Sequence, residues 1–301
     1  MRLQGTYTAL VTPFRGSDVD HEGLRNNIEF QIENGISGLV ALGTTAETPV
    51  LSESERERIL DAVLDTANGR VPVIAGTGSN ATEHTIADTR RAREVGADAA
   101  LIVAPYYNKP TQEGLYRHYA AIADAVDMPI IVYNIMGRTG VNITTDTMER
   151  LARIPSIIAV KEASGSIAQA QDVLQRILPE RPDFSVLSGD DGLAPAMIAM
   201  GGHGVISVAS NLIPRETCEL INAALCGDLA RMRRLFLSLN PVFQALFIET
   251  NPVPVKEAME YWGMPSGAPR LPLVPLTDNN RVTLYRVLDT FRVAGRIEEA
   301  I

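Results

Sequence analysis

The chain has 301 residues, of which 46% are hydrophobic and 21% charged, so it can bury a large core and does not have a disordered composition. Its net charge of -9 and the lack of a basic stripe argue against nucleic acid as a partner. No apolar run approaches the length of a membrane span, and the N-terminal stretch is broken by polar residues and Pro13, unlike a signal peptide. We therefore expect a cytoplasmic protein with neither a membrane nor a nucleic acid as its partner.

Cysteine and histidine usage argues against a disulfide framework or a metal site. Cys218 and Cys226 lie in one apparently helical stretch, and we interpret them as free, buried thiols in a reducing cytoplasm. The four histidines are scattered without ligand spacing, at positions 21, 84, 118 and 203. We expect no metal ion and no organic cofactor.

Eight short apolar runs of strand-like composition alternate with amphipathic stretches from the N-terminus to about residue 225. The runs are nearly continuous hydrophobes, a pattern typical of parallel strands that are buried on both faces. The predicted strands are Tyr7–Val11, Gly38–Leu42, Pro72–Ala75, Ala99–Ala104, Pro129–Asn134, Ile157–Lys161, Phe184–Ser188 and Gly204–Val208.

Helical periodicity and helix-end signals occur between these runs. In Arg58–Ala67 and in Ile167–Leu178 the apolar residues fall on one face. Two pairs of residues have the spacing of capping boxes that open helices, Ser52 with Glu55 and Asp146 with Glu149. Three glycines follow helical stretches as C-cap signals: Gly35, Gly69 and Gly96.

Eight strand–helix units in succession favour one closed (β/α)8 barrel, a TIM barrel of the α/β class, over a doubly wound sheet. We place this catalytic barrel at residues 1–226. The remainder, residues 227–301, is predicted to be a small helical extension with helices at Leu229–Ile248, Val255–Trp262 and Asn279–Ala294. Chemistry in such barrels lies at the C-terminal ends of the strands and in the loops after them. The candidate functional residues are therefore expected there.

Lysine is rare in this chain, and one lysine ends a predicted barrel strand. The 27 basic residues comprise 24 arginines and three lysines: Lys109, Lys161 and Lys256. Lys161 is expected at the barrel mouth, where desolvation lowers the pKa of an amine, and a neutral amine can attack a carbonyl. An amine that merely extends from the strand end to solvent is the alternative, which the scarcity of lysine disfavours. We predict that Lys161 is a nucleophile, that Lys109 lies at the surface or an interface, and that Lys256 is structural.

Polar residues after the neighbouring strands could assist such a lysine. Tyr133 ends the adjacent strand, where a phenol could shuttle protons, although tyrosines at strand ends also commonly pack. Gly43, Thr44 and Thr45 follow the second strand, where backbone N–H groups could hold a carboxylate and hydroxyls could relay protons. Arg138, five residues after Tyr133, is suited to grip a carboxylate.

Other kinds of barrel protein are weaker alternatives. A Gly-x-Gly-x-x-Ala motif at residues 76–81 matches a dinucleotide fingerprint, but the next strand ends without the acidic residue that the fingerprint requires. Asp190 and Asp191 follow the seventh strand and would repel a phosphate at the place where many barrels bind one. A nicotinamide-dependent oxidoreductase and a phosphorylated substrate are both disfavoured, and a non-catalytic binding barrel would form no imine.

Seven segments in register resemble one known family over essentially the whole chain. They are GTTAE, PYYNKPTQEGLY, YNIMGRTG, VKEAS, SGDD, GVISVASN and NPVPVKEAM. Their order is similar to that in the dihydrodipicolinate synthase / N-acetylneuraminate lyase family of pyruvate-dependent class I aldolases. The resemblance implies a lyase that forms a Schiff base with pyruvate without a metal or cofactor, in a homo-oligomer that is a tetramer.

Within the family the chain resembles the branch that condenses pyruvate with L-aspartate 4-semialdehyde in lysine and diaminopimelate biosynthesis. By position, the resemblance implies that Lys161 forms the imine and that Tyr133 shuttles protons. Thr45 would link Tyr133 to Tyr107, which would reach in from a neighbouring subunit. The implied substrate contacts are Thr44 and Thr45 for the pyruvate carboxylate, Arg138 for the carboxylate of the semialdehyde, and Ile206. The nearest alternative is a related pyruvate-dependent aldolase that acts on a 2-keto-3-deoxy sugar acid.

The chain departs from the family pattern in three places. Met136 stands where a proline is common in the loop before Arg138, and Ala46 replaces a frequent glycine. In the cleft where feedback-inhibited members bind lysine, Asn80 and Tyr106 match the family, whereas three residues differ: Glu53, Arg56 and His84. Ordinary inhibition by lysine is therefore not expected.

Overall fold

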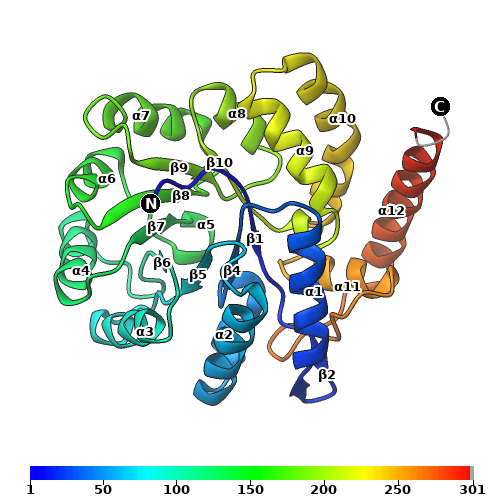
Figure 1. Cartoon of the computed structure of the whole chain (residues 1–301), viewed down its shortest axis with the longest axis horizontal. Coiled ribbons are helices and arrows are strands. Elements are labelled where there is room, and N and C mark those ends of the chain that lie inside the picture. The colour runs from blue at the N-terminus through cyan, green and yellow to red at the C-terminus, as the bar shows by residue number, and fades with distance from the viewer. Residues whose placement is uncertain (299–301) are drawn as a thin grey trace.

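Eight parallel strands close into a barrel with helices around it, in a computed structural model that describes residues 1–298 (Figure 1). Residues 299–301, the end of the expected C-terminal extension, lie outside the described residues. The barrel strands are β1 (Gly5–Ala9), β4 (Gly38–Ala41), β5 (Val73–Gly76), β6 (Ala99–Val103), β7 (Ile130–Asn134), β8 (Ile157–Glu162), β9 (Ser185–Ser188) and β10 (Gly204–Ser207). Going round the barrel the order is β1-β10-β9-β8-β7-β6-β5-β4, and β4 pairs back with β1. The predicted TIM barrel and its eight strands are confirmed.

The first strand begins and ends two residues earlier than predicted, at Gly5 and Ala9. Gly5 pairs with Gly204 of β10, and both residues have positive φ angles, 97° and 151°. A Cβ atom on Gly204 would overlap the backbone of Gly5, so the two glycines permit a close approach that other residues would block. Glycine and threonine at the start of β1 hid this part of the strand from a search for apolar runs.

The helices that follow the strands form the outer layer of the barrel (Figure 1). They are α1 (His21–Glu33), α2 (Glu53–Ala67), α3 (Thr82–Glu94), α4 (Gln112–Ala125), α6 (Thr145–Ala152), α7 (Ile167–Ile177), α8 (Ala194–Ala199) and α9 (Pro214–Leu225), whereas the short helix α5 (Met136–Thr139) lies inside this ring. A small antiparallel hairpin of β2 (Phe14–Arg15) and β3 (Asp18–Val19) precedes α1. Three short 3-10 turns are η1 (Thr44–Ala46), η2 (Thr48–Val50) and η3 (Ala209–Asn211).

The helix-end signals were read correctly in all but one case. Ser52 opens α2 with a full capping box, because its hydroxyl accepts from the Glu55 N–H at 3.2 Å and the Glu55 carboxylate accepts from the Ser52 N–H at 2.8 Å. The box expected at Asp146 and Glu149 is wrong. The hydroxyl of Thr144 accepts from the Thr147 N–H at 3.4 Å instead, so α6 begins before Asp146. The three predicted C-cap glycines all have positive φ: Gly35 (81°), Gly69 (69°) and Gly96 (98°).

Two layers of apolar side chains explain why chemistry is confined to the ends of the barrel. One layer lies between the strands and the surrounding helices. The other fills the barrel interior with alternate strand residues, among them Val40, Ile74, Leu101, Ile131, Ala159, Leu187 and Ile206. The interior is therefore a packed core rather than a channel, and a ligand can be reached only at the strand ends.

The C-terminal segment packs against the barrel through a third buried cluster. It contains α10 (Leu229–Ala245), α11 (Val253–Tyr261) and α12 (Asp278–Glu298). Val242 and Phe243 of α10 and Val255 of α11 share this cluster with Val11 and Val208, which follow β1 and β10. Figure 1 shows α12 at the outer edge, beyond α1 and α11. The chain after α9 therefore returns to the ends of two barrel strands.

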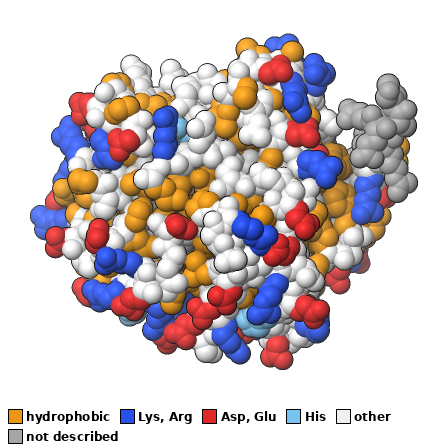
Figure 2. Space-filling model, viewed as in Figure 1, with side chains coloured by type: hydrophobic (Ala, Val, Ile, Leu, Met, Phe, Trp, Pro, Cys, Tyr) orange, Lys and Arg blue, Asp and Glu red, His pale blue; other side chains and the backbone are white. Residues whose placement is uncertain are grey.

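Surface and thiol properties complete the description. Positive and negative side chains are interspersed over the face shown in Figure 2. Within residues 1–298 no helix combines the length and apolarity needed to cross a membrane. Both cysteines are free, but only Cys218 is buried. Cys226 is exposed, because it lies at the C-terminal end of α9, so the expectation of two buried thiols is wrong for it.

Candidate active site

Lys161 lies near the end of β8, and only 5% of the residue's surface is exposed to solvent. Burial lowers the pKa of Lys161 to about 7; the negative charge of Asp191 opposes this shift, and the positive charge of Arg138 adds to it. Desolvation disfavours the charged form, so a large fraction of the amine is neutral near pH 7. A neutral amine in a buried position is the form that attacks a carbonyl group.

Tyr133 is the direct neighbour of Lys161 across the β7–β8 ladder, and the amine nitrogen lies 4.3 Å from the centre of its ring. Burial raises the pKa of Tyr133 to about 12, while the charge of Arg138 and a hydrogen bond with the Thr44 side chain lower it. The phenol is therefore protonated near neutral pH and can donate a proton to a group held above the lysine.

The turn after β4 presents one threonine to Tyr133 and buries the other. Thr44 lines the same cavity as Tyr133, and its side chain helps to lower the pKa of the phenol. Thr45 is 2% exposed, and its hydroxyl accepts a hydrogen bond from the Asn251 amide at 3.1 Å. The link from Thr45 to Tyr133 that the resemblance implies stays a prediction, while Thr44 is the threonine that lines the cavity with Tyr133. The two side chains leave η1 in different directions, which adjacent positions in a sequence cannot distinguish.

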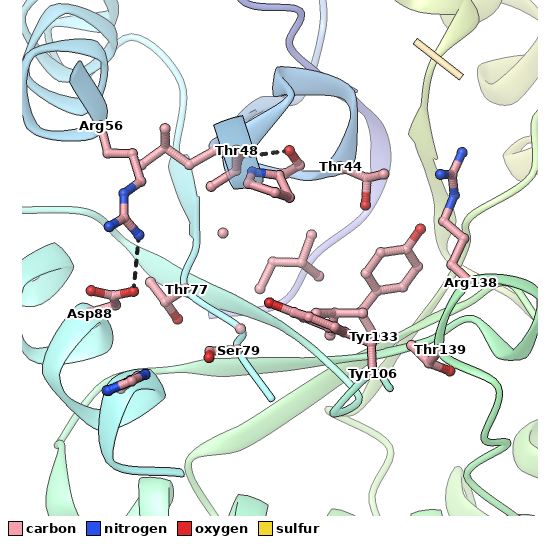
Figure 3. Close-up of a pocket in the computed structure, with 18 of the residues that line it drawn as sticks. Thr44, Thr48, Arg56, Thr77, Ser79, Asp88, Tyr106, Tyr133, Arg138 and Thr139 are labelled. Carbon is pink, nitrogen blue, oxygen red and sulfur yellow. Dashed lines mark hydrogen bonds and ion pairs between the residues drawn. The ribbon is translucent and has the colours of Figure 1, made fainter. Parts of the chain in front are cut away.

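Arg138 lies on the short helix α5 and lines the same cavity. One of its guanidinium nitrogens donates to the backbone carbonyl of Asn251 at 3.1 Å. Figure 3 shows Thr44, Tyr133 and Arg138 gathered at one end of the cavity. Met136, which replaces the common proline, begins α5 and is 49% exposed. This geometry allows the guanidinium to hold a carboxylate near the phenol.

The cavity has a volume of about 540 Å³ and extends from this cluster towards α2 and α3. At its far end Arg56 donates to the Asp88 carboxylate at 3.4 Å, as Figure 3 shows. Glu53, His84 and Tyr106 also line the cavity, and Figure 3 shows Tyr106 next to Tyr133. These include the positions that differ from the lysine cleft of the family, so the expected lack of ordinary lysine inhibition stays a prediction.

The glycines of the apparent dinucleotide motif have a packing role. A Cβ atom on Gly76 would overlap the backbone of Leu42, and one on Gly78 would overlap the backbone of Val103. Both glycines therefore allow close approach between neighbouring segments of the barrel wall. This accounts for the motif without a nucleotide.

Of the predicted site residues, Thr44, Tyr133 and Arg138 line the cavity, whereas four others do not: Lys161, Thr45, Tyr107 and Ile206. Tyr107 is 88% exposed and has a φ of 75°, while its neighbour Tyr106 lines the cavity. Ile206 of β10 is fully buried and packs in the barrel interior with Tyr133 and Leu187. Ile206 thus supports the floor beneath the phenol, and Tyr107 faces away from the protein.

Two neighbours of Lys161 were missed by the sequence analysis. Asp191 is 4% exposed; one carboxylate oxygen accepts from the N–H groups of Val208 and Ala209 at 3.1 and 3.0 Å, and the other has no partner among the described residues. A Cβ atom on Gly189 would lie 3.0 Å from Cε of Lys161, so this glycine makes room for the lysine stem. Their position after β9 is evident from the sequence, but two adjacent aspartates there indicate only that a phosphate would be repelled.

A buried polar network holds the ends of β7 and β8 together behind the lysine. The Glu162 carboxylate accepts hydrogen bonds from the Asn134 amide at 3.1 Å, the Gln169 amide at 3.2 Å and the Ser164 N–H at 2.7 Å. Charge-assisted bonds of this kind restrict the orientation of the strand ends that carry Tyr133 and Lys161. In the part of the chain that the structure describes, no group of three or more His, Cys, Asp or Glu side chains is placed to hold a metal.

The fold and the site together define a (β/α)8-barrel protein with a buried lysine of lowered pKa beside a protonated phenol and an arginine. A family model described as the dihydrodipicolinate synthetase family matches residues 2–290. The chain belongs to this family, which confirms the resemblance seen in its motifs.

Known relatives match over nearly their whole lengths. The 4-hydroxy-tetrahydrodipicolinate synthase of Thermomicrobium roseum is 52% identical over 286 residues, which cover 95% of this chain and 94% of that protein. The crystal structure of dihydrodipicolinate synthase from Aquifex aeolicus is 47% identical with a TM-score of 0.93, covering 96% of this chain and 98% of that one. A structure described as the first monomeric dihydrodipicolinate synthase variant is 41% identical with a TM-score of 0.94, covering 96% of each chain.

Proposed function

We propose that this protein catalyses the 4-hydroxy-tetrahydrodipicolinate synthase reaction, the condensation of pyruvate with L-aspartate 4-semialdehyde in lysine and diaminopimelate biosynthesis. The observation that carries the proposal is the buried Lys161, whose pKa is lowered to about 7, next to Tyr133. Membership of the family and the near full-length match to a synthase of that name support it.

The first step joins Lys161 to pyruvate. The neutral amine attacks the keto carbon, and loss of water from the resulting carbinolamine forms the imine. Tyr133, protonated near pH 7, donates the proton that the departing hydroxyl needs, and Thr44 lies in the same cavity as the phenol. The Tyr133 phenolate left by this step takes a proton from the pyruvate methyl group, which gives an enamine, and the enamine carbon attacks the aldehyde of the second substrate.

The two carboxylates of the substrates fit different parts of the site. The turn that carries Thr44 and Thr45 is suited to the pyruvate carboxylate, because the first N–H groups of a 3-10 turn have no partner within it. Arg138 is suited to the carboxylate of the semialdehyde, because a guanidinium can bind it through two parallel hydrogen bonds. Ile206 supports the floor on which pyruvate would rest.

Borohydride reduction in the presence of pyruvate tests the proposal. Mass spectrometry should find a reduced pyruvyl adduct on Lys161, and Lys161→Met should abolish it. The chain supplies its own controls, because Lys109 is exposed and Lys256 is buried in an ion pair. An intact protein without an adduct, or an adduct on Lys109 alone, would sink the assignment.

The second substrate is tested by comparing turnover of L-aspartate 4-semialdehyde with cleavage of 2-keto-3-deoxygluconate. We expect the semialdehyde to be preferred, and Arg138→Ala to raise its KM more than that of pyruvate. Preference for the sugar acid would favour the related aldolase instead, while leaving the lysine chemistry in place.

We also propose that the protein acts in the cytoplasm as a homo-oligomer, a tetramer, in which Tyr107 enters the site of a neighbouring subunit. The exposed phenol of Tyr107, 88% accessible on a strained loop with a φ of 75°, supports this assignment. Analytical ultracentrifugation should detect a species of four chains. A monomer at working concentrations would contradict this part of the proposal.

A further inference from the structure

A second buried lysine lies close to the site but takes no part in the chemistry described above. Lys256 of α11 is 1% exposed, and its amine lies 2.7 Å from the carboxylate of Glu47, which is equally buried. The amine also donates to the backbone carbonyl of Thr12 at 3.1 Å and lies 4.1 Å from the ring centre of Phe14. Lys256 is therefore enclosed by segments that follow β1 and β4.

Glu47 stands at the end of the turn that presents Thr44. It is the residue directly after η1, and it adopts a left-handed conformation with a φ of 56°. Its first carboxylate oxygen binds Lys256, and its second accepts from the Arg270 N–H at 2.9 Å. The C-terminal segment thus holds both oxygens of the residue that ends the turn.

The same segment reaches the site at a second point, five residues before Lys256. The Asn251 amide donates to the Thr45 hydroxyl, and the Asn251 carbonyl accepts from Arg138. The turn after β4 and the arginine of α5 are therefore both attached to the beginning of α11. A displacement of α11 would move Thr44 and Arg138 relative to Tyr133.

Stability alone does not explain two charges in this place. Taking an ammonium and a carboxylate out of water is unfavourable, and a well-packed apolar pair often serves the fold equally well. Burial lowers the pKa of Lys256, while the Glu47 carboxylate opposes that shift. The ion pair forms a short, directional contact between α11 and the turn. Buried ionic groups can restrict a protein to a single local geometry in this way.

We propose that Lys256 and Glu47 form a positioning pair, which keeps the Gly43–Glu47 turn in the geometry that places Thr44 in the cavity beside Tyr133. The pair therefore serves the proton-transfer steps rather than the stability of the fold. This inference rests on the proposed function of Lys161 and Tyr133. It predicts that the fold and the imine tolerate loss of both charges, whereas turnover does not.

The double variant Glu47→Gln/Lys256→Met tests the inference, because it removes both charges and keeps the side-chain volumes similar. Its thermal midpoint should equal or exceed that of the parent protein, since no unpaired buried charge is left. Borohydride trapping of pyruvate on Lys161 should go to completion, whereas kcat should fall by about 10- to 100-fold, the range expected for a small misplacement of catalytic groups. KM for pyruvate should change much less.

Further variants separate positioning from general damage. Glu257→Gln is the matched control, because Glu257 follows Lys256 in α11 but forms an ion pair with Arg281, at a distance of 2.9 Å, outside the site. The kinetic constants of this variant should equal those of the parent protein. A folded double variant with the parent kcat would overturn the inference. If the double variant does not fold, the variant Glu47→Asp tests the inference instead, because it keeps both charges and shortens the acidic side chain by one methylene group. A several-fold loss of kcat in Glu47→Asp supports positioning, and an unchanged kcat overturns it.

The trapping result in the parent protein keeps this test apart from that of the proposed function. Failure of the parent to form the Lys161 adduct would reject the function itself. An adduct in the parent together with full turnover in the double variant would reject only the positioning pair.

Discussion

At the scale of single residues, Lys161 shows how burial and nearby charge set reactivity together. Desolvation is the largest influence on its pKa, and the two charges that face it act in opposite directions. Asp191 favours the ammonium and Arg138 favours the neutral amine, so each can be tested separately.

The rate of pyruvate trapping should rise with pH and reach half of its maximum near pH 7, the midpoint of the titration, because only the neutral amine of Lys161 reacts. Below the midpoint the rate should fall about tenfold per pH unit. Arg138→Ala should move the midpoint to higher pH and Asp191→Asn to lower pH, as judged by quenched-flow trapping and mass spectrometry. A midpoint near 10 in the parent protein would show that the amine is not desolvated.

Lys161→Met should stabilise the fold most at acid and neutral pH. The pKa of Lys161 is about 7 in the folded protein and about 10.4 in an unfolded chain, so the unfolded state holds the proton more tightly. The lysine therefore destabilises the fold by up to roughly 5 kcal/mol below pH 7, and this penalty disappears as the pH rises from 7 to about 10. Urea denaturation should show a larger gain at pH 6 than at pH 10. A gain that does not vary with pH would contradict the lowered pKa.

The two threonines of η1 should respond differently to loss of the hydroxyl. Thr44→Val removes the hydroxyl that lines the cavity with Tyr133 and should lower kcat by about 100-fold with little change in stability. Thr45→Val leaves the buried Asn251 amide without its acceptor and should lower the free energy of unfolding by about 1–3 kcal/mol. Steady-state kinetics and denaturation of both variants provide the comparison. Equal losses of kcat at fixed stability would favour the relay role implied for Thr45.

At the scale of elements, helix ends illustrate when a local signal suffices. The box at Ser52 and Glu55 was predicted and is present, because nothing stronger competes for the start of α2. The box at Asp146 failed, because Thr144 two residues earlier caps α6 and Asp146 pairs with Arg176 at 2.7 Å. A capping pattern therefore predicts that a helix begins nearby, but it does not identify the first residue of that helix.

Ser52→Ala should lower the free energy of unfolding by about 1 kcal/mol, because it removes the side-chain acceptor of the α2 capping box. The kinetic constants should not change, since Ser52 lies outside the cavity lining. Ser54→Ala is the control: Ser54 is exposed in the first turn of the same helix, and its loss should change stability by only a few tenths of a kcal/mol. An equal effect of both substitutions would argue against the cap.

At the scale of the whole molecule, the C-terminal segment does more than extend the barrel. It shares a buried cluster with residues that follow β1 and β10, and it supplies Asn251 and Lys256 next to the site. The order of the elements along the chain predicted an appendage after the eighth unit. Its contacts instead reach the turn after β4 and the arginine of α5.

Subunit mixing should show whether Tyr107 completes a neighbouring site. Tyr107→Ala and Lys161→Met should each be nearly inactive alone. When the two are unfolded together and reassembled in equal amounts, about a quarter of the sites should combine an intact Lys161 with a donated Tyr107, given random pairing of subunits across a two-fold interface. Turnover assays on the mixture and on each variant alone make the comparison. If mixing restores no activity, the role proposed for Tyr107 would be rejected.

The sequence by itself determined the class of fold and the central residue. Continuous apolar runs predict strands that are buried on both faces, and eight of them with intervening helices have few arrangements other than a closed barrel. Lys161 could be singled out because only three lysines occur and one of them ends a strand. Tyr133 followed because successive strands are neighbours in such a barrel, as their direct pairing confirms.

Only the tertiary structure decided which side chains turn towards one another across the site. It placed Thr44 in the cavity with Tyr133 and turned Thr45 towards Asn251, placed Asp191 beside Lys161, and brought Asn251 and Lys256 to the turn after β4. The physical reason is that the burial pattern of a strand or a helix depends on residues that are close in the sequence, so the order of apolar and polar residues along the chain reveals it. The direction of a side chain in a turn, and the meeting of residues more than two hundred positions apart, depend on how the completed barrel packs.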